Sequence, residues 1–379
     1  MKKRFLLLGG TGAMGRNLSQ ILSRHDVEIF VTSRKRHDSD KPGVHYLVGN
    51  AKDMCYLKSL ANENFDCIVD FMAYSTDEFR ERYLLLLSMT KQYVFISSAR
   101  VYAESKEAIT ENTPRLLDVC VDKEYLKTDE YALAKARQED LLFNSEFKNW
   151  TIIRPSITFD TYRLQLGVME KESWLYRAIH GRKIVFSKDI ACHVTTNTSG
   201  YDVAEGIASI MGNPKALREV FNITCGKSYK WSEILDIYIE VLTEYLHEKP
   251  KVVMVEKCPF FAERKYQIIY SRYFDRHFDN SKIKRVMTRK FTPMKDDLCK
   301  ALKAFLENPI FGPISIKDEA KLDRLSSDWM SLNELHGYIA KVEYLIYRFI
   351  KSNRADRIFN IFLHIRQKIL KIKARILNN

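Results

Sequence analysis

The sequence lacks the cysteine patterns that mark a metal site or a disulfide framework. Its seven cysteines are scattered, none forms a Cys-x-x-Cys pair, and none stands at a zinc-ligand spacing from histidine. We therefore predict no bound metal and no disulfide bonds, which is usual for a protein in a reducing cytoplasm.

A long hydrophobic run is also missing. Basic residues 2–4 are followed by four apolar residues, 5–8, and then by glycine. This run is far too short for the core of a signal peptide or for a membrane span. We expect residues 5–8 to form a buried first strand and the protein to be cytoplasmic.

Acidic residues are outnumbered by basic ones. The 379 residues contain 61 Lys and Arg against 48 Asp and Glu, a formal charge of +13, whereas the hydrophobic share of 46% is ordinary for a globular protein. The excess positive charge favours anionic partners such as nucleotide phosphates, lipid headgroups or nucleic acid.

Short apolar runs alternate with segments of helical periodicity over the first 155 residues. Strands are expected at residues 4–8, 27–31, 44–48, 67–72, 93–96 and 150–153, and helices at 16–24, 78–90 and 129–146. This alternation predicts an α/β fold with a doubly wound parallel sheet that is covered by helices on both faces.

A glycine turn joins the first strand to the first helix. Gly9, Gly12 and Gly15 are spaced so that the chain can turn tightly and backbone amides can approach a pyrophosphate at the helix N-terminus. This context predicts a dinucleotide cofactor, the alternative being a turn that binds nothing.

The end of the second expected strand has no carboxylate to hold a ribose 2′-hydroxyl. Three basic residues, Arg34 to Arg36, stand there instead and suit a 2′-phosphate, so we favour NADP over NAD. A solvated basic turn is the alternative. Asn50 and Asp53, after the third strand, are expected to face the adenine.

A catalytic set is suggested by a tyrosine and a lysine one helical turn apart. Tyr131 and Lys135 share a helix face, and the lysine charge would favour the tyrosine phenolate that acid/base chemistry needs. Ser98 follows the strand at 93–96 and would hydrogen-bond the same substrate oxygen.

The order of these features resembles the extended short-chain dehydrogenase/reductase family, the NAD-dependent epimerase/dehydratase group that modifies nucleotide-activated sugars. The resemblance covers about residues 3–305 and implies a Rossmann-type fold, with Ser98 as hydrogen-bond donor, Tyr131 as acid/base and Lys135 as its modulator. Expected cofactor-binding residues are Gly9, Thr11, Gly12, Ala13, Met14, Gly15, Ser33, Arg34, Asn50, Ala51, Phe71, Met72, Ala73, Tyr131, Lys135 and Pro155. Expected substrate-binding residues are Tyr74, Ser98, Arg100, Arg163 and Arg272.

Three domains are predicted. Residues 1–160 form the NAD(P)-binding Rossmann domain, whose sheet is completed by parts of 190–225. Residues 161–312 form mainly the substrate lobe, and residues 313–379 a basic helical C-terminal extension. We expect a homodimer, because dimers are common in the family.

Two departures from the family pattern narrow the expected reaction. Ala99 and Arg100 follow the catalytic serine where sugar 4,6-dehydratases have an Asp-Glu pair, so dehydration is disfavoured and an epimerase or ketoreductase remains. The stretch 191–199 contains no arginine to grip a nucleotide diphosphate, and Arg163 or Arg272 is expected to supply that charge. The resemblance places the reaction in surface polysaccharide biosynthesis.

The C-terminal tail combines charge with an apolar stripe. From His336 onward, ten Lys and Arg stand against Glu343 and Asp356. Apolar residues such as Ile358, Ile361, Ile365 and Ile369 recur at helical spacing between the charges. The helix is expected either to contact the inner face of a membrane or to pack on protein. An RNA-binding or regulatory protein without turnover is the alternative function, but no nucleic-acid recognition motif supports it.

Overall fold

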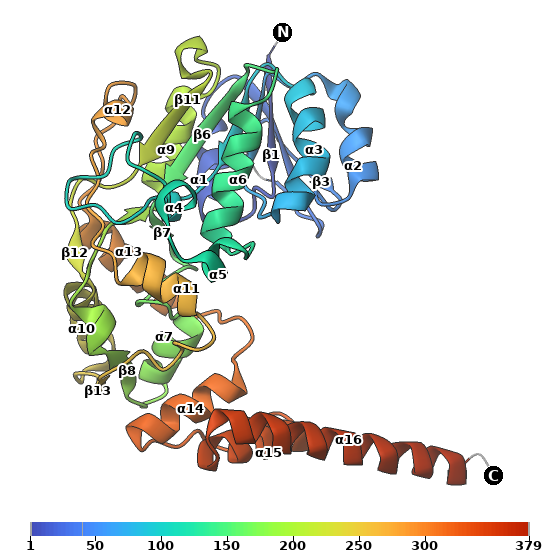
Figure 1. Ribbon diagram of the computed structural model, residues 1–379, viewed down its shortest axis with the longest axis vertical. Coiled ribbons are helices and arrows are strands. Elements are labelled where there is room, and N and C mark those ends of the chain that lie inside the picture. Colours follow the sequence, from blue (N-terminus) through green and yellow to red (C-terminus); the bar gives the residue numbers. More distant parts are fainter. Residues whose placement is uncertain (1, 40, 378–379) are drawn as a thin grey trace.

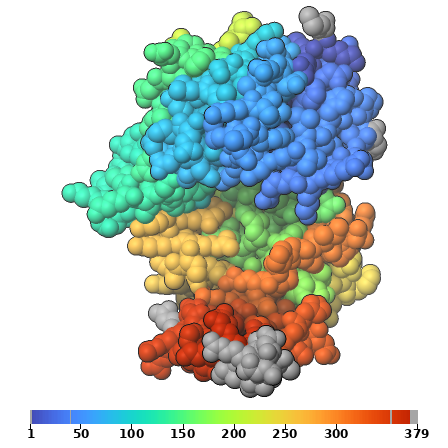
Figure 2. Space-filling model, turned by 90° about the vertical axis from the view of Figure 1, so that its right-hand side faces the viewer, coloured from blue at the N-terminus to red at the C-terminus, as the bar shows by residue number. Residues whose placement is uncertain are grey.

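The computed structural model describes residues 2–39 and 41–377, except for the side chains of 352–353 and 372–377. The last two residues of the predicted extension, 378–379, lie outside the described part. Three tiers lie one after another along the long axis of the molecule, with the N-terminal residues in the first and the C-terminal helices in the third (Figure 1). Figure 2 shows the same order from the side, with blue and cyan above, orange in the middle and red below.

The first tier is a seven-stranded parallel sheet of order β11-β6-β5-β4-β1-β2-β3. The central strands β4 and β5 are buried at every residue, as expected for a parallel sheet whose two faces are covered by helices. The strands are β1 (Lys3–Leu8), β2 (Val27–Ser33), β3 (Val44–Val48), β4 (Cys67–Asp70), β5 (Tyr93–Ile96), β6 (Trp150–Pro155) and β11 (Glu219–Ile223). The predicted doubly wound α/β fold is thereby confirmed.

Helices pack on both faces of this sheet through separate apolar clusters. Leu18 and Ile21 of α1 join Val203 and Ile207 of α9 on one face. Leu57 of α2, Phe79 of α3 and Leu142 of α6 lie on the other. The helices are α1 (Ala13–Leu22), α2 (Met54–Ser59), α3 (Thr76–Ser88), α6 (Tyr131–Phe143), α9 (Gly200–Ile210) and α12 (Ser281–Lys284), and the 3-10 turns are η1 (Ala61–Glu63), η2 (Ala99–Val101) and η3 (Pro214–Ala216).

The second tier has its own core, centred on Trp174, Trp231 and Tyr238. Small strand pairs tie its loops together: β10-β7, β12-β9 and β13-β8. Its elements are β7 (Ile157–Phe159), α7 (Lys171–Ile179), β8 (Ile184–Ser187), α8 (Lys188–Ala191), β9 (Val194–Thr195), β10 (Asn197–Ser199), β12 (Tyr229–Lys230), α10 (Trp231–Leu246), β13 (Val252–Val255), α11 (Lys265–Gln267), the π-helical turn η4 (Ile268–Arg272) and α13 (Met294–Glu307).

The third tier consists of α14 (Ile316–Ser326), α15 (Tyr338–Phe349) and α16 (Ser352–Leu377). Its small core contains Ala320, Tyr344 and Tyr347. Between the first two tiers, the loop after β5 carries two short helices, α4 (Leu116–Val119) and α5 (Lys123–Leu126). No helix in the described part of the chain is both long and apolar enough to cross a bilayer.

Candidate active site

The expected cofactor residues gather at one edge of the sheet. Because its strands are parallel, the turns after β1, β2, β3, β4 and β6 all emerge at the carboxyl edge. The glycine turn follows β1, Ser33 ends β2, Asn50 and Ala51 follow β3, residues 71–73 follow β4, and Pro155 ends β6.

The glycine turn contains two kinds of glycine. A Cβ at Gly15 would lie 2.4 Å from the carbonyl oxygen of Gly10, so Gly15 is needed for the close packing of α1 on the turn. A Cβ on Gly12 would meet no protein atom within 4 Å, and its φ of −83° suits any residue. No contact within the protein requires glycine at position 12. A ligand that approaches the N-terminus of α1 closely would require it, because a side chain there would occupy the ligand's space.

Of the basic residues after β2, Arg36 pairs with Asp38 at 3.8 Å, which leaves Arg34 to meet an anion. Arg34 is exposed and makes no hydrogen bond or ion pair to any described residue. The Ser33 hydroxyl accepts a hydrogen bond from the Lys35 amide at 3.1 Å. Asp53, expected at the adenine, instead caps α2 by accepting the amide of Cys55 at 2.8 Å.

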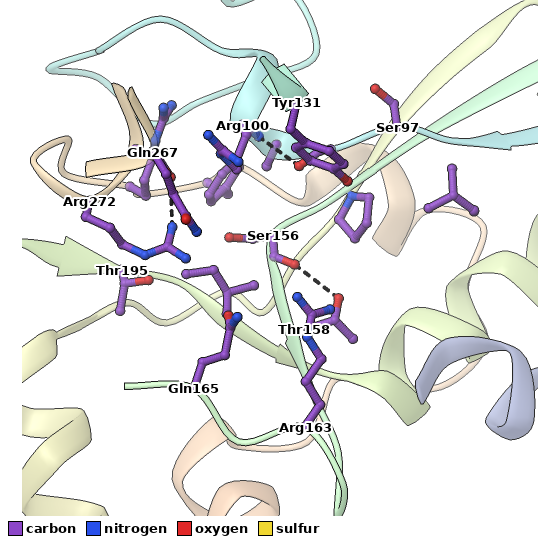
Figure 3. A pocket seen from close by; sticks show the side chains of 18 of the residues that line it. Ser97, Arg100, Tyr131, Ser156, Thr158, Arg163, Gln165, Thr195, Gln267 and Arg272 are labelled. Carbon is purple, nitrogen blue, oxygen red and sulfur yellow. Dashed lines mark hydrogen bonds between the residues drawn. The ribbon is translucent and has the colours of Figure 1, made fainter. Parts of the chain in front are cut away.

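Beside this edge, a cleft of about 410 Å³ opens between the sheet domain and the second tier. Figure 3 shows Arg100, Tyr131, Gln165 and Arg272 directed into it from different elements. The lining residues are Met14, Ile96, Ser97, Ser98, Ala99, Arg100, Tyr131, Pro155, Ser156, Ile157, Thr158, Arg163, Gln165, Glu170, Thr195, Trp231, Arg264, Gln267, Ser271, Arg272, Arg276 and Phe278. The cleft therefore contains two of the three predicted catalytic residues, Ser98 and Tyr131.

Tyr131 begins α6 and faces the cleft. Its side chain is 41% exposed, and its hydroxyl makes no hydrogen bond to any described residue. The guanidinium carbon of Arg100 lies 5.3 Å from the centre of its ring. Arg100 is held there by an ion pair with Glu130, which also caps α6 by accepting the Ala132 amide at 2.9 Å. A positive charge is thus fixed next to the phenol.

Lys135 lies one turn further along α6, beneath the cleft floor. Its ammonium donates to the Ile96 carbonyl oxygen at 2.8 Å and sits 4.4 Å from the centre of the Phe95 ring. Burial lowers its pKa to about 8, although the Asp70 and Glu139 carboxylates act in the opposite direction.

A buried ion network fixes α6 against the sheet. Glu139 accepts two hydrogen bonds from Arg154, at 2.8 and 2.6 Å, and one from the Ser97 hydroxyl at 2.6 Å. Arg154 belongs to β6 and Ser97 follows β5, so the network joins both strands to the helix that carries Tyr131. Its members are deeply buried, which makes the helix position stiff.

The cleft is strongly positive. Five arginines line it against one carboxylate, Glu170. Arg272 is buried and donates from Nε to the Gly167 carbonyl oxygen at 2.8 Å. Burial and the nearby Arg100 charge lower the pKa of Arg272 to about 9 and that of Arg276 to about 10. Each guanidinium remains charged at neutral pH, so an anionic ligand would relieve a real electrostatic cost.

Comparison with known proteins agrees with this architecture. No protein-family model matches the chain. The UDP-glucuronic acid 4-epimerase of Bacillus cereus aligns with a TM-score of 0.61 and 14% identity over 81% of this chain and all of the epimerase (100%). WbmH of Bordetella bronchiseptica, solved with NAD+, aligns with a TM-score of 0.62 and 15% identity over 82% of this chain and 100% of its own.

The chain has the Rossmann-type α/β fold of these two solved structures. One curated relative is a chloroplast stem-loop binding protein of 41 kDa from Arabidopsis thaliana, 28% identical over 244 residues. The match spans 60% of this chain and 60% of the relative's length.

The structure adds cleft residues that the sequence did not reveal. Arg264, Gln165 and Arg276 line the cleft, and the Arg276 side chain is held by the carbonyl oxygens of Ala103 and Tyr102. The available signal was the spacing of arginines around the η4 turn, at positions 264, 272 and 276.

One expected substrate residue lies elsewhere. Tyr74 is not among the residues that line the cleft. It is buried in the cluster beneath α3, with the Arg82 guanidinium carbon 4.6 Å from its ring centre. The Tyr74 side chain thus points toward the helix layer that contains α3 and away from the carboxyl edge of the sheet. Arg163 and Arg272 do line the cleft.

Proposed function

We propose that this protein is an NAD(P)-dependent enzyme that acts on a nucleotide-linked sugar by hydride transfer at one sugar carbon, as an epimerase or a ketoreductase. The observation that carries the proposal is one cleft that combines Ser98, Tyr131 and five arginines beside the glycine turn. Arginines suit a diphosphate, and the hydroxyls suit a carbinol or ketone.

The residues would divide the work as follows. Ser98 and Tyr131 hydrogen-bond the reacting oxygen, and Tyr131 takes its proton when a carbinol is oxidised or returns it when a ketone is reduced. Arg100, whose guanidinium carbon lies 5.3 Å from the ring centre, helps to position the Tyr131 ring. Arg272 and Arg276 hold the diphosphate away from the reacting carbon.

A nicotinamide, when bound, supplies the hydride acceptor and donor. The residues of this chain fit such a group, because Gly12 leaves open space at the start of α1 and the parallel strand ends converge there. Lys135 would contribute positive charge below the nicotinamide ribose. Arg34, exposed and unpaired among the described residues, supports NADP, whereas two of the compared structures hold NAD.

Dehydration fits the site less well than simple hydride transfer. The position after Ser98 is alanine, and the next, Arg100, is tied to Glu130. No carboxylate at this point would supply the acid and base of an elimination. We further propose that the product serves surface polysaccharide synthesis and that the enzyme works as a homodimer.

A second candidate function is stem-loop binding without turnover, which the Arabidopsis relative's name suggests. The basic cleft would suit a nucleic-acid phosphate, but a pure binder would not need Tyr131 beside Ser98. The two candidates differ in whether Tyr131→Phe removes an activity.

The first experiment identifies the cofactor. The purified protein is denatured, the released nucleotide is identified by mass, and the apo form is titrated with NADPH and NADH. Retained NAD favours an epimerase that recycles its cofactor, and an empty site that prefers NADPH favours a ketoreductase. Binding of neither dinucleotide would contradict the proposed function.

A further inference from the structure

The C-terminal extension is fixed to the second tier by a buried ion network. Arg177 of α7, with no exposed side-chain surface, pairs with Asp323 at 2.7 Å and with Glu319 at 3.1 Å. Lys183 pairs with Asp328 at 2.8 Å. Because removing one member would leave the others buried and unpaired, α14 is held firmly to the lobe.

The start of α16 is held in turn. Ala355 is fully buried, and Asp356 accepts hydrogen bonds from Lys317 and Tyr347, both at 2.6 Å. Beyond this point the helix runs away from the body as a long arm (Figure 1). Its 26 residues span about 39 Å.

The arm presents apolar side chains that nothing in the described chain covers. Ile358, Ile361, Ile365 and Ile369 recur at helical spacing and are each 40–52% exposed. Tyr338 of α15, also exposed, lies with its ring centre 6.1 Å from that of Phe362, which extends the stripe with an aromatic. An exposed apolar stripe of this kind on a helical arm that runs away from the body indicates a binding surface for another molecule.

Charge on the arm has one sign. From residue 357 to the end, the sequence has six Lys and Arg and no Asp or Glu. At about 100° per residue, Lys371 falls about 125° from the centre of the isoleucine stripe, and Arg357 and Lys368 border the stripe at about 85° and 65°. The helix thus has an apolar face and, beside it, a cationic face.

We propose that α16 docks this protein on an anionic lipid bilayer surface, with the isoleucine stripe in the acyl boundary and the cations among the headgroups. Pairing with a second copy would bring two rows of like charge together. Nucleic acid would engage the cations and leave the isoleucines exposed to water. Of these three partners, only the bilayer would contact both the apolar face and the cationic face of α16.

The test is cosedimentation of the full chain with vesicles of phosphatidylcholine alone or mixed with phosphatidylglycerol. The apolar variant is Ile361→Gln with Ile365→Gln, matched by Leu84→Gln, an exposed leucine on α3. The charge variant is Lys368→Gln with Lys371→Gln, matched by Lys58→Gln on α2.

We expect binding to the anionic vesicles only, weakened by salt. The isoleucine variant should lose more than tenfold in affinity, and the charge variant about fivefold per cation. Both controls should bind like the wild type, and circular dichroism should show all variants folded. No binding at low salt would overturn the proposal, as would binding that survives the isoleucine change. A dimer that dissociates in the isoleucine variant, or stem-loop RNA bound while vesicles are not, would assign the arm to those partners instead.

Discussion

Gly12, in the β1–α1 turn, and Gly15, in the first turn of α1, allow folding and cofactor binding to be separated. In Gly12→Ala, the new methyl group enters open space at a φ of −83°. The alanine is a poorer N-cap than glycine but restricts the unfolded chain, and these effects oppose each other. We expect the free energy of unfolding to change by no more than about 1 kcal/mol. The methyl group would stand where the pyrophosphate approaches, so dinucleotide affinity should fall at least about tenfold, or 1.4 kcal/mol.

Gly15→Ala is the matched control, because its methyl group meets protein. A Cβ 2.4 Å from the Gly10 carbonyl oxygen forces the turn and α1 apart and should cost roughly 1–3 kcal/mol of stability. Urea unfolding and fluorescence titration with NADH and NADPH measure both quantities on both variants. A folded Gly12→Ala protein that binds dinucleotide as tightly as the wild type would refute the cofactor assignment of this turn.

Three further predictions concern side chains around the cleft. Glu139→Gln leaves the buried Arg154 charge without its carboxylate and should lower the free energy of unfolding, measured by urea titration, by about 3–5 kcal/mol. A loss below about 1 kcal/mol would contradict the role of the buried ion network in fixing α6. Burial lowers the pKa of Lys135 to about 8, so the wild type carries a cost of about 3 kcal/mol at neutral pH that fades as pH rises from 8 toward 10. The Lys135→Met variant should therefore be more stable than the wild type near pH 7 by about 1–2 kcal/mol, because losing the hydrogen bond to Ile96 offsets about 1 kcal/mol of the gain. A stability gain that does not shrink at high pH would contradict this reasoning. Arg272→Met should raise KM for a UDP-sugar more than about tenfold without lowering kcat comparably, and an unchanged KM would remove Arg272 from the diphosphate site.

Much of the sheet domain was predictable, because its strands are short apolar runs between glycines and polar turns. The expected strands at 44–48 and 93–96 match β3 and β5 in full, and the helix expected at 129–146 is α6 at Tyr131–Phe143. Because parallel strands have their carboxyl ends at the same edge of the sheet, the sequence predicts that the glycine turn, Ser98 and Tyr131 lie near one another.

The rest of the site depends on contacts that no local pattern encodes. Tyr74 follows a strand that points at the ligand edge, yet its side chain packs under α3, because a position in sequence does not fix a side-chain direction in a turn. Arg276 reaches the cleft from far along the chain through carbonyl contacts that form only in the folded lobe. The Glu139–Arg154 ion pair joins a helix to a strand, and the separation of these residues in the sequence does not predict that they are in contact.

The central claim is that Tyr131 performs acid/base chemistry on a nucleotide-linked sugar. Wild type and Tyr131→Phe are incubated with UDP-sugars and either dinucleotide, and products are followed by NMR while ligand affinity is measured separately. Tyr131 is 41% exposed and makes no hydrogen bond to any described residue, so the variant should fold normally. We predict turnover at least about a hundredfold slower with unchanged dinucleotide affinity. Equal turnover by both proteins, or none by the wild type with any nucleotide sugar, would contradict the account.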